Sequence, residues 1–302
     1  MKKLLLLLAT VLFAAPGPLF AAPVPSPKPA PSAAAAAEKH YVDSVHATLR
    51  FQQGRVALPG GVAELTVPRG LRYLDSAQSR RVLTQLWRNP DGKCLGMLFP
   101  ADRGPLDDRN WAYVIEYDPM GYVKDDDAED IKYDELLAEM QQDVADGNAE
   151  RTAAGFAPAQ LLGWAAPPYY DKSQHALHWA KLLRFGADSA QSLNYNVRLL
   201  GRKGVLVLNA VAQADALPTI KAGIPDLLAN VQFAKGQQYL DYTAGLDEVA
   251  AYSIGGLVAG KVLAKVGLFA VVLKFWKLGL LALGGAWAGL KRFFGFGSKE
   301  EA

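Results

Sequence analysis

Alternating apolar and polar positions fill the middle of the chain and predict β-strands. In residues 111–117 the large side chains Tyr113, Ile115 and Tyr117 occupy every second position, so they share one face of a strand. Turn-forming residues separate two pairs of such runs, which predicts two hairpins. The predicted strands are 62–67, 111–117, 161–170, 177–185, 193–200 and 205–211.

Three segments instead carry apolar residues at helical spacing. The clearest is 133–144, where an apolar stripe follows a group of carboxylates that we expect to cap the helix. Residues 76–87 form the second segment and residues 217–231 the third, in which Pro225 is expected to interrupt or restart the helix. This order of elements predicts an α+β domain with a mainly antiparallel sheet and packed helices.

The N-terminal residues have the three parts of a secretory signal peptide. Lysines precede an apolar run at 4–15 and small residues follow it, so residues 1–22 are predicted to be the signal peptide. The run is shorter than the roughly 20 residues that span a bilayer. Phe20 and Pro23 fit the cleavage site imperfectly, which leaves an uncleaved anchor as the alternative. Residues 23–38 are almost entirely Pro, Ala and Ser and predict an extended spacer.

The C-terminal part is apolar and rich in glycine, and it predicts a membrane-anchor region at 248–294. Lysines interrupt this region, and a lysine at the bilayer centre costs about 2.5–3.5 kcal/mol on insertion scales. The arrangement with the lowest cost puts one transmembrane helix within about 266–290, with Lys274 and Lys277 reaching toward an interface or another helix. Residues 295–302 then form a cytoplasmic tail. A hairpin lying on the membrane is the alternative.

A second, shorter helix is expected at 249–263, either at the membrane interface or packed against the first. Two glycine pairs, Gly256 with Gly260 and Gly285 with Gly289, have the spacing that lets membrane helices approach closely. They are the candidates for helix packing in the membrane and for a homo-oligomer. Glycine-rich composition alone is the simpler explanation of both pairs.

Composition narrows the classes of function. A formal net charge of +2 gives no support for binding through an extended basic face, so nucleic acid is not expected as a partner. Cys94 is the only cysteine, which excludes an intrachain disulfide, and we interpret it as a buried, unreactive thiol. The sequence has no G-x-S-x-G nucleophile motif and no phosphate-binding P-loop, and no cofactor is expected.

The densest acidic cluster lies just before the helix predicted at 133–144. Asp125, Asp127 and Asp130 are weak candidates for calcium or magnesium ligands, because the run lacks the glycine and distal glutamate of a calcium-binding loop. Helix capping is the simpler explanation. Two histidines, His175 and His178, are expected on a strand with side chains on opposite faces, so no metal site is predicted.

Five residues form the candidate ligand-binding set. Arg202 and Lys203, in the turn between the last two strands, can hold an anion together with backbone N–H groups. Trp164 and Tyr169 lie near two prolines and can line a groove for a peptide or glycan. Arg198, in the strand before the turn, completes the set. A solvated turn and cross-strand packing are the simpler explanations.

Several short stretches carry a further signal: GYVKDDDA at 121–128, YDELL at 133–137, GW at 163–164 with PY at 168–169, LNY at 193–195 with Arg198, and LGR at 200–202 with GVL at 204–206. Together they resemble a bacterial family of uncharacterised membrane-anchored proteins, a domain of unknown function. The resemblance covers about residues 51–290 and implies an exported domain with a C-terminal membrane anchor. It implies no catalytic residues, and the lysine-interrupted anchor departs from it. A looser similarity, in element order only, is to the sandwich of the photosystem II extrinsic P subunit, and it bears on the fold alone.

The sequence therefore predicts a single-pass protein of the inner membrane, with residues 39–247 as an α+β domain in the periplasm or outside the cell. The leading hypothesis is a non-enzymatic domain that binds an envelope protein or polymer. One alternative is an envelope enzyme with an unfamiliar site near the acidic segment 125–130. Another is a membrane assembly or structural factor that acts through its glycine-rich helices.

Overall fold

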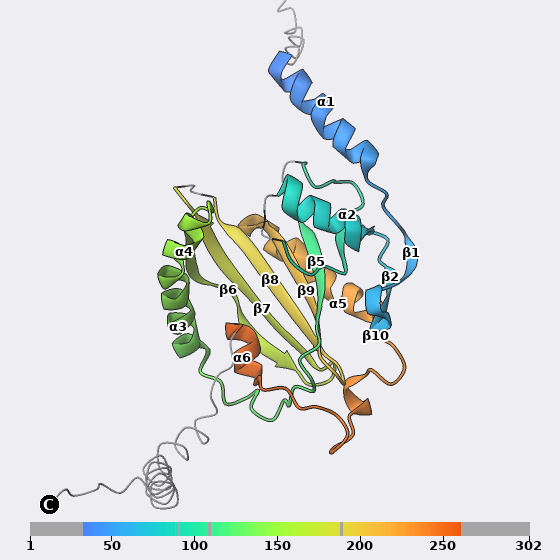
Figure 1. Cartoon of the computed structure of the whole chain (residues 1–302), viewed down its shortest axis with the longest axis vertical. Helices are drawn as coiled ribbons and strands as arrows, with labels where there is room; N and C mark the ends of the chain where they lie inside the picture. Colours follow the sequence, from blue (N-terminus) through green and yellow to red (C-terminus); the bar gives the residue numbers. More distant parts are fainter. Residues whose placement is uncertain (1–32, 88, 90, 108–109, 188–189, 261–302) are drawn as a thin grey trace, which may run out of the picture. The chain divides into compact units, whose positions relative to one another are not determined.

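The computed structural model describes residues 33–87, 89, 91–107, 110–187 and 190–260. The chain forms two compact units, residues 1–41 and 42–302, and helix α1 (Ala33–Thr48) crosses the boundary between them. The fold described below is that of the second unit (Figure 1).

The second unit is built on a seven-stranded sheet in which all neighbouring strands are antiparallel. The strand order is β3-β4-β5-β9-β8-β7-β6, and the pairs β6–β7 and β8–β9 are the two predicted hairpins. The mainly antiparallel α+β fold is therefore confirmed. The strands are β3 (Leu71–Asp75), β4 (Gly96–Pro100), β5 (Ala112–Asp118), β6 (Ala159–Asp171), β7 (Ala176–Phe185), β8 (Ser192–Leu200) and β9 (Val205–Gln213).

One face of this sheet is covered by a small second sheet and by helix α5 (Leu217–Ala229). Tyr113 and Tyr195 on the large sheet are buried in the same core as Leu65 of the small sheet and Ile220 of α5. The small sheet has the antiparallel order β1-β2-β10 and consists of β1 (Gly54–Ala57), β2 (Ala63–Val67) and β10 (Val231–Phe233).

The opposite face carries two separate apolar cores. The first lies over β3, β4 and β5, where Met97 packs with Val82 of the π-helical turn that follows α2 (Ser76–Arg81). The second lies over β6, β7 and β9, where Trp179 packs with Met140 of α3 (Tyr133–Asp146) and Leu257 of α6 (Ile254–Ala259). Figure 1 shows α2 on one side of this face and α3, α6 and α4 (Asn148–Ala153) on the other.

The register shows that both cores lie on the same face. Val114 of the first core pairs with Asn209, Asn209 pairs with Asn196, and Asn196 pairs with Trp179 of the second core. Directly opposed residues of antiparallel strands point to the same side. Two apolar covers are thus separated by polar positions in the middle of the sheet.

Helix α5 differs from its prediction at Pro225. The helix runs through this proline without a break, although proline removes one N–H donor from the helix interior. Pro225 and Lys221, the residue four positions earlier, are both exposed. Water can therefore satisfy the carbonyl group that loses its partner, and the helix continues.

The chain after residue 247 also differs from its prediction. The expected helix at 249–263 is only α6, which begins after the capping hydroxyl of Ser253 and ends at Gly260 in the left-handed conformation. Its apolar residues are buried in the second core, so they face protein. In the part of the chain that the structure describes, no helix is long and apolar enough to cross a membrane. The predicted span at 266–290 lies outside the described residues.

Candidate functional site

The acidic segment before α3 contacts other parts of the fold and does not cap α3. That helix has Lys132 at its N-cap without a side-chain hydrogen bond, so the capping prediction is wrong. Asp127 instead accepts a hydrogen bond from the N–H of Ile254, the first residue of α6 (3.3 Å). Glu129 pairs with Lys172 in the β6–β7 turn (2.6 Å). Asp130 is exposed.

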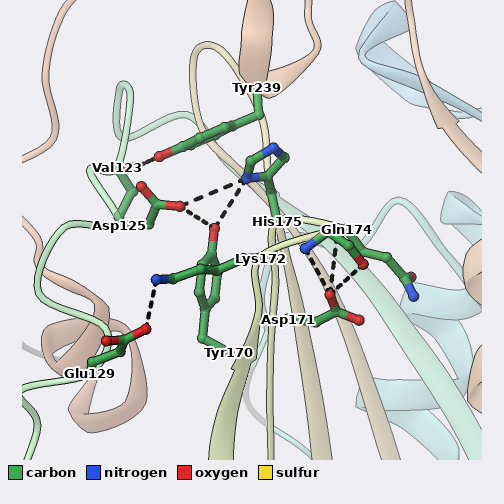
Figure 2. Close-up of polar contacts among 10 residues, drawn as sticks. Val123, Asp125, Glu129, Tyr170, Asp171, Lys172, Gln174, His175 and Tyr239 are labelled. Atoms are coloured by element: carbon green, nitrogen blue, oxygen red, sulfur yellow. Dashed lines mark hydrogen bonds and ion pairs between the residues drawn. The ribbon is translucent and has the colours of Figure 1, made fainter.

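Asp125 lies in a polar cluster with Tyr170 and His175 (Figure 2). The hydroxyl group of Tyr170 donates to Asp125 Oδ2 (2.8 Å) and lies 3.3 Å from His175 Nδ1. His175 Nδ1 is itself 3.8 Å from Asp125 Oδ2. Among the described residues, no group of three or more acidic, histidine or cysteine side chains is arranged to hold a metal ion.

A column of stacked rings flanks this cluster. His175 stacks on Tyr239 (ring centroids 4.2 Å apart), Tyr239 stacks on Tyr122 (4.6 Å) and Tyr122 stacks on Tyr242 (3.9 Å). The Tyr239 hydroxyl donates to the carbonyl oxygen of Val123 (3.1 Å). The column joins the acidic segment, the β6–β7 turn and the segment after β10, so it holds three loops together.

Two tyrosines of this site keep their protons at neutral pH. Burial raises the pKa of Tyr170, and its hydrogen bond with Asp125 raises it further. Burial also raises the pKa of Tyr239, with a further contribution from its contact with Tyr122. Both hydroxyl groups therefore act as hydrogen-bond donors and not as bases. The His175 and Asp125 side chains are 25% and 30% exposed, so solvent reaches both of them.

The two basic residues predicted in the β8–β9 turn do different things. Arg202 donates to Asp247 Oδ2 (2.8 Å) and to the carbonyl oxygen of Gly236 (3.3 Å). The Arg202 guanidinium lowers the pKa of the Asp247 carboxyl, whose side chain is 5% exposed. Lys203 is exposed. Arg202 thus fastens the segment before α6 to the turn, and only Lys203 points its charge to solvent.

The structure does not bring Trp164 and Tyr169 together. Trp164 pairs with Lys181 and packs against the second core, whereas Tyr169 pairs with His178 on the opposite face of the sheet. Tyr169 is 49% exposed and its ring stacks on His178 (4.6 Å). Irregular pairing along β6 separates the two aromatic residues.

Arg198 lies on the face with the two apolar covers. Its side chain is 18% exposed, and its guanidinium lies 5.5 Å from the ring of Trp179. Arg198 Nη1 is 3.5 Å from Asp118 Oδ2, while Arg198 Nε is buried without a partner. Of the five candidate ligand-binding residues, Arg198 and Trp164 each have a buried donor without a partner, Arg198 Nε and Trp164 Nε1.

Only one of the two glycine pairs lies among the described residues. Gly256 is buried in α6, and Gly260 ends that short helix, so the two do not lie along one long helical face. Gly285 and Gly289 lie outside the described residues. The thiol of Cys94 is buried, as predicted, and burial raises its pKa to about 11, which disfavours the reactive thiolate.

No curated protein matches the chain. Several solved structures resemble it distantly, among them the following two. Cyanobacterial PsbP (CyanoP) from Synechocystis sp. PCC 6803 shares 11% identity, with a TM-score of 0.35 over 62% of this chain and 94% of that chain. The Ran-binding protein Mog1p of Saccharomyces cerevisiae shares 11% identity, with a TM-score of 0.29 over 61% and 96%. Both similarities are too distant to indicate a function. The family model described as "Protein of unknown function (DUF2167)" matches residues 50–288, and the chain therefore belongs to this family.

Proposed function

We propose that this chain is a membrane-tethered binding domain of the cell envelope without catalytic activity. The signal-peptide pattern at 1–22, the spacer at 23–38 and the apolar segment at 266–290 support the tether. In this arrangement the inner membrane holds the C-terminal end, and the globular domain lies in the periplasm or outside the cell. An envelope protein or an envelope polymer is the partner.

One observation carries the binding function: the polar gap between the two apolar covers of the large sheet. We call this gap the central strip, and it consists of Lys181, Asn194, Asn196, Arg198 and Asn209. The strip lies between two apolar patches that helices cover, and its strands give it a fixed floor. Such a floor suits recognition, because strands hold side chains more rigidly than loops do.

A two-part experiment on the full chain in bacterial cells tests the proposal. Reporter fusions at Tyr239 and Ala302 should give an exported signal and a cytoplasmic signal, respectively. In the same cells, p-benzoylphenylalanine in place of Asn194 should form a light-dependent adduct with the bound partner. The same replacement at the exposed Gln142 of α3 is the matched control and should give none.

Each part has an outcome against the proposal. Exported signals at both fusion points would mean that the C-terminal segment does not cross the membrane, and the single-span tether would be wrong. Equal adducts at positions 194 and 142, or none at either, would remove the central strip as the binding surface.

A second candidate function rests on the cluster of Asp125, Tyr170 and His175. A carboxylate, a hydroxyl and an imidazole within hydrogen-bonding reach can move a proton, as in general acid–base catalysis. Since Tyr170 retains its proton and donates a hydrogen bond to Asp125, His175 would be the general base, oriented by the Tyr170 hydroxyl 3.3 Å from its Nδ1. This second candidate is the envelope enzyme with an unfamiliar site near the acidic segment 125–130.

Substitutions separate an enzymatic role of this cluster from a structural one. If the cluster is structural, Tyr170→Phe should lower the free energy of unfolding by about 1–2 kcal/mol, because a hydrogen bond to a partly exposed carboxylate is lost. In that case the His175→Gln variant, expressed in a strain that lacks the gene, should still restore the normal cellular phenotype. Complementation lost in His175→Gln, with urea unfolding and the adduct at position 194 unchanged, would favour the enzyme.

A further inference from the structure

The central strip concentrates amide and cationic side chains on three adjacent strands. Asn209 of β9 pairs with Asn196 of β8, and Asn194 of β8 pairs with Lys181 of β7. Arg198 lies two residues beyond Asn196 on the same face of β8. Asn196 is 7% exposed, and the other members of the strip are half-buried. These groups are held where water reaches them only in part.

One cation of the strip, Arg198, lies over an aromatic ring, and the other, Lys181, lies further along the neighbouring strand. Trp179 precedes Lys181 by two residues on the same face of β7, and the Arg198 guanidinium lies over the Trp179 ring. Burial lowers the pKa of Lys181, and the charge of Arg198 lowers it further. An anion close to both cations would favour the ionised form of Lys181, which burial and the Arg198 charge disfavour.

The carboxylates of this face do not neutralise both cations. Asp118, whose side chain is 54% exposed, is 3.5 Å from Arg198 at the end of β5. Glu116 lies on the same face but two strands from Arg198, roughly 10 Å away by the spacing of strands. Within the described part of the chain, Lys181 has no ion-pair partner.

Buried polar atoms in the strip also lack partners. Arg198 Nε and Asn209 Oδ1 are both inaccessible to solvent and form no hydrogen bond. Buried polar groups in native proteins are nearly always satisfied, so an unsatisfied donor and acceptor on one face indicate a missing polar partner. A cavity of about 430 Å³ opens at the Arg198 end of the strip, and Arg198 is the one strip residue in its lining, which also includes Asp118, Met120, Tyr252 and Leu257. This volume is in the range of small-ligand sites.

We propose that the central strip binds an anionic sugar, either free or as a unit of a polysaccharide. Its carboxylate or phosphate group lies between Lys181 and Arg198, and its hydroxyl groups bind Asn194, Asn196 and Asn209. Amide side chains both donate and accept, which matches hydroxyl groups, and the two cations match the anionic group. This inference rests on the proposed function and names its ligand class.

Calorimetric titration of the full chain in detergent tests the ligand class. The probes are tetragalacturonate for carboxylates, glucose 6-phosphate for phosphates, and maltotetraose as the neutral sugar. We expect one acidic probe to bind and maltotetraose to bind at least tenfold more weakly. Lys181→Met should raise the Kd for the acidic probe at least tenfold, and the exposed-turn variant Lys203→Met should leave it unchanged.

Arg198 packs on Trp179, so Arg198→Met can also disturb folding. Asn194→Ala is the second variant, since it keeps both cations and should weaken binding of the acidic probe by a smaller factor than Lys181→Met. Equal binding of acidic and neutral probes, or equal Kd values for Lys181→Met and Lys203→Met, would overturn the inference. If neither acidic probe binds while position 194 still forms its adduct, the ligand class is wrong and the binding function stands.

Discussion

Acidification from pH 6.5 to about pH 4 should lower the free energy of unfolding by about 3 kcal/mol through one side chain, His178. This loss comes in addition to the one that protonation of the chain's carboxylates causes. His178 is 2% exposed, and burial lowers its pKa to about 4, although Asp171 opposes part of this effect. In the unfolded chain the same imidazole has an ordinary pKa near 6.5. Between these two values the unfolded state binds a proton that the folded state excludes, so stability falls as the pH falls.

Replacement of His178 with phenylalanine should remove the part of the acid destabilisation that His178 causes. Phenylalanine keeps a ring for the stack on Tyr169 and removes Nδ1, which is buried without a partner. Urea unfolding at several pH values should therefore show a shallower acid slope for His178→Phe than for the parent chain. His40→Gln, at an exposed position, is the matched control and should keep the parent slope. Identical slopes in all three chains would show that folding does not lower the pKa of His178.

The hairpins were predictable because the signals that define them are local. In β8 and β9, alternation of side chains fixes the buried face, and four turn residues fix the register. The turn also passes so close to β5 that a Cβ on Gly204 would collide with the carbonyl oxygen of Asp118. This last contact is a property of the assembled sheet and leaves no trace in the sequence around Gly204.

Helix α6 shows why the end of the domain was misjudged. An apolar run has the same composition whether lipid or protein covers it, and the second core needed apolar residues from Ile254 to Val258. The local stop signals were present, since Ser253 caps the helix and Gly260 ends it. The length of the surrounding apolar sequence nevertheless favoured the prediction of a longer helix at 249–263.

The candidate sites depend on contacts that the sequence does not encode locally. Asp125 and Tyr170 are 45 residues apart, and they meet because the β6–β7 turn lies beside the acidic segment. The central strip needs the register of three strands before its members can be placed on one face. The sequence singled out Arg198 from this strip, but its neighbours Lys181 and Asn209 carry no motif.

Replacement of Trp179 with alanine should cause the largest loss of stability, about 3–5 kcal/mol, because a large aromatic side chain leaves a cavity that the core cannot fill. Trp179 is 1% exposed, and it packs under both α3 and α6 while Arg198 covers its ring. Trp164→Ala is the matched control: this tryptophan also packs on the second core but is half-buried, so a smaller loss is expected. Urea unfolding at neutral pH measures both. If Trp179→Ala costs no more than Trp164→Ala, the second core does not depend on the ring that Arg198 covers, and the floor of the central strip would be less rigid than its burial indicates.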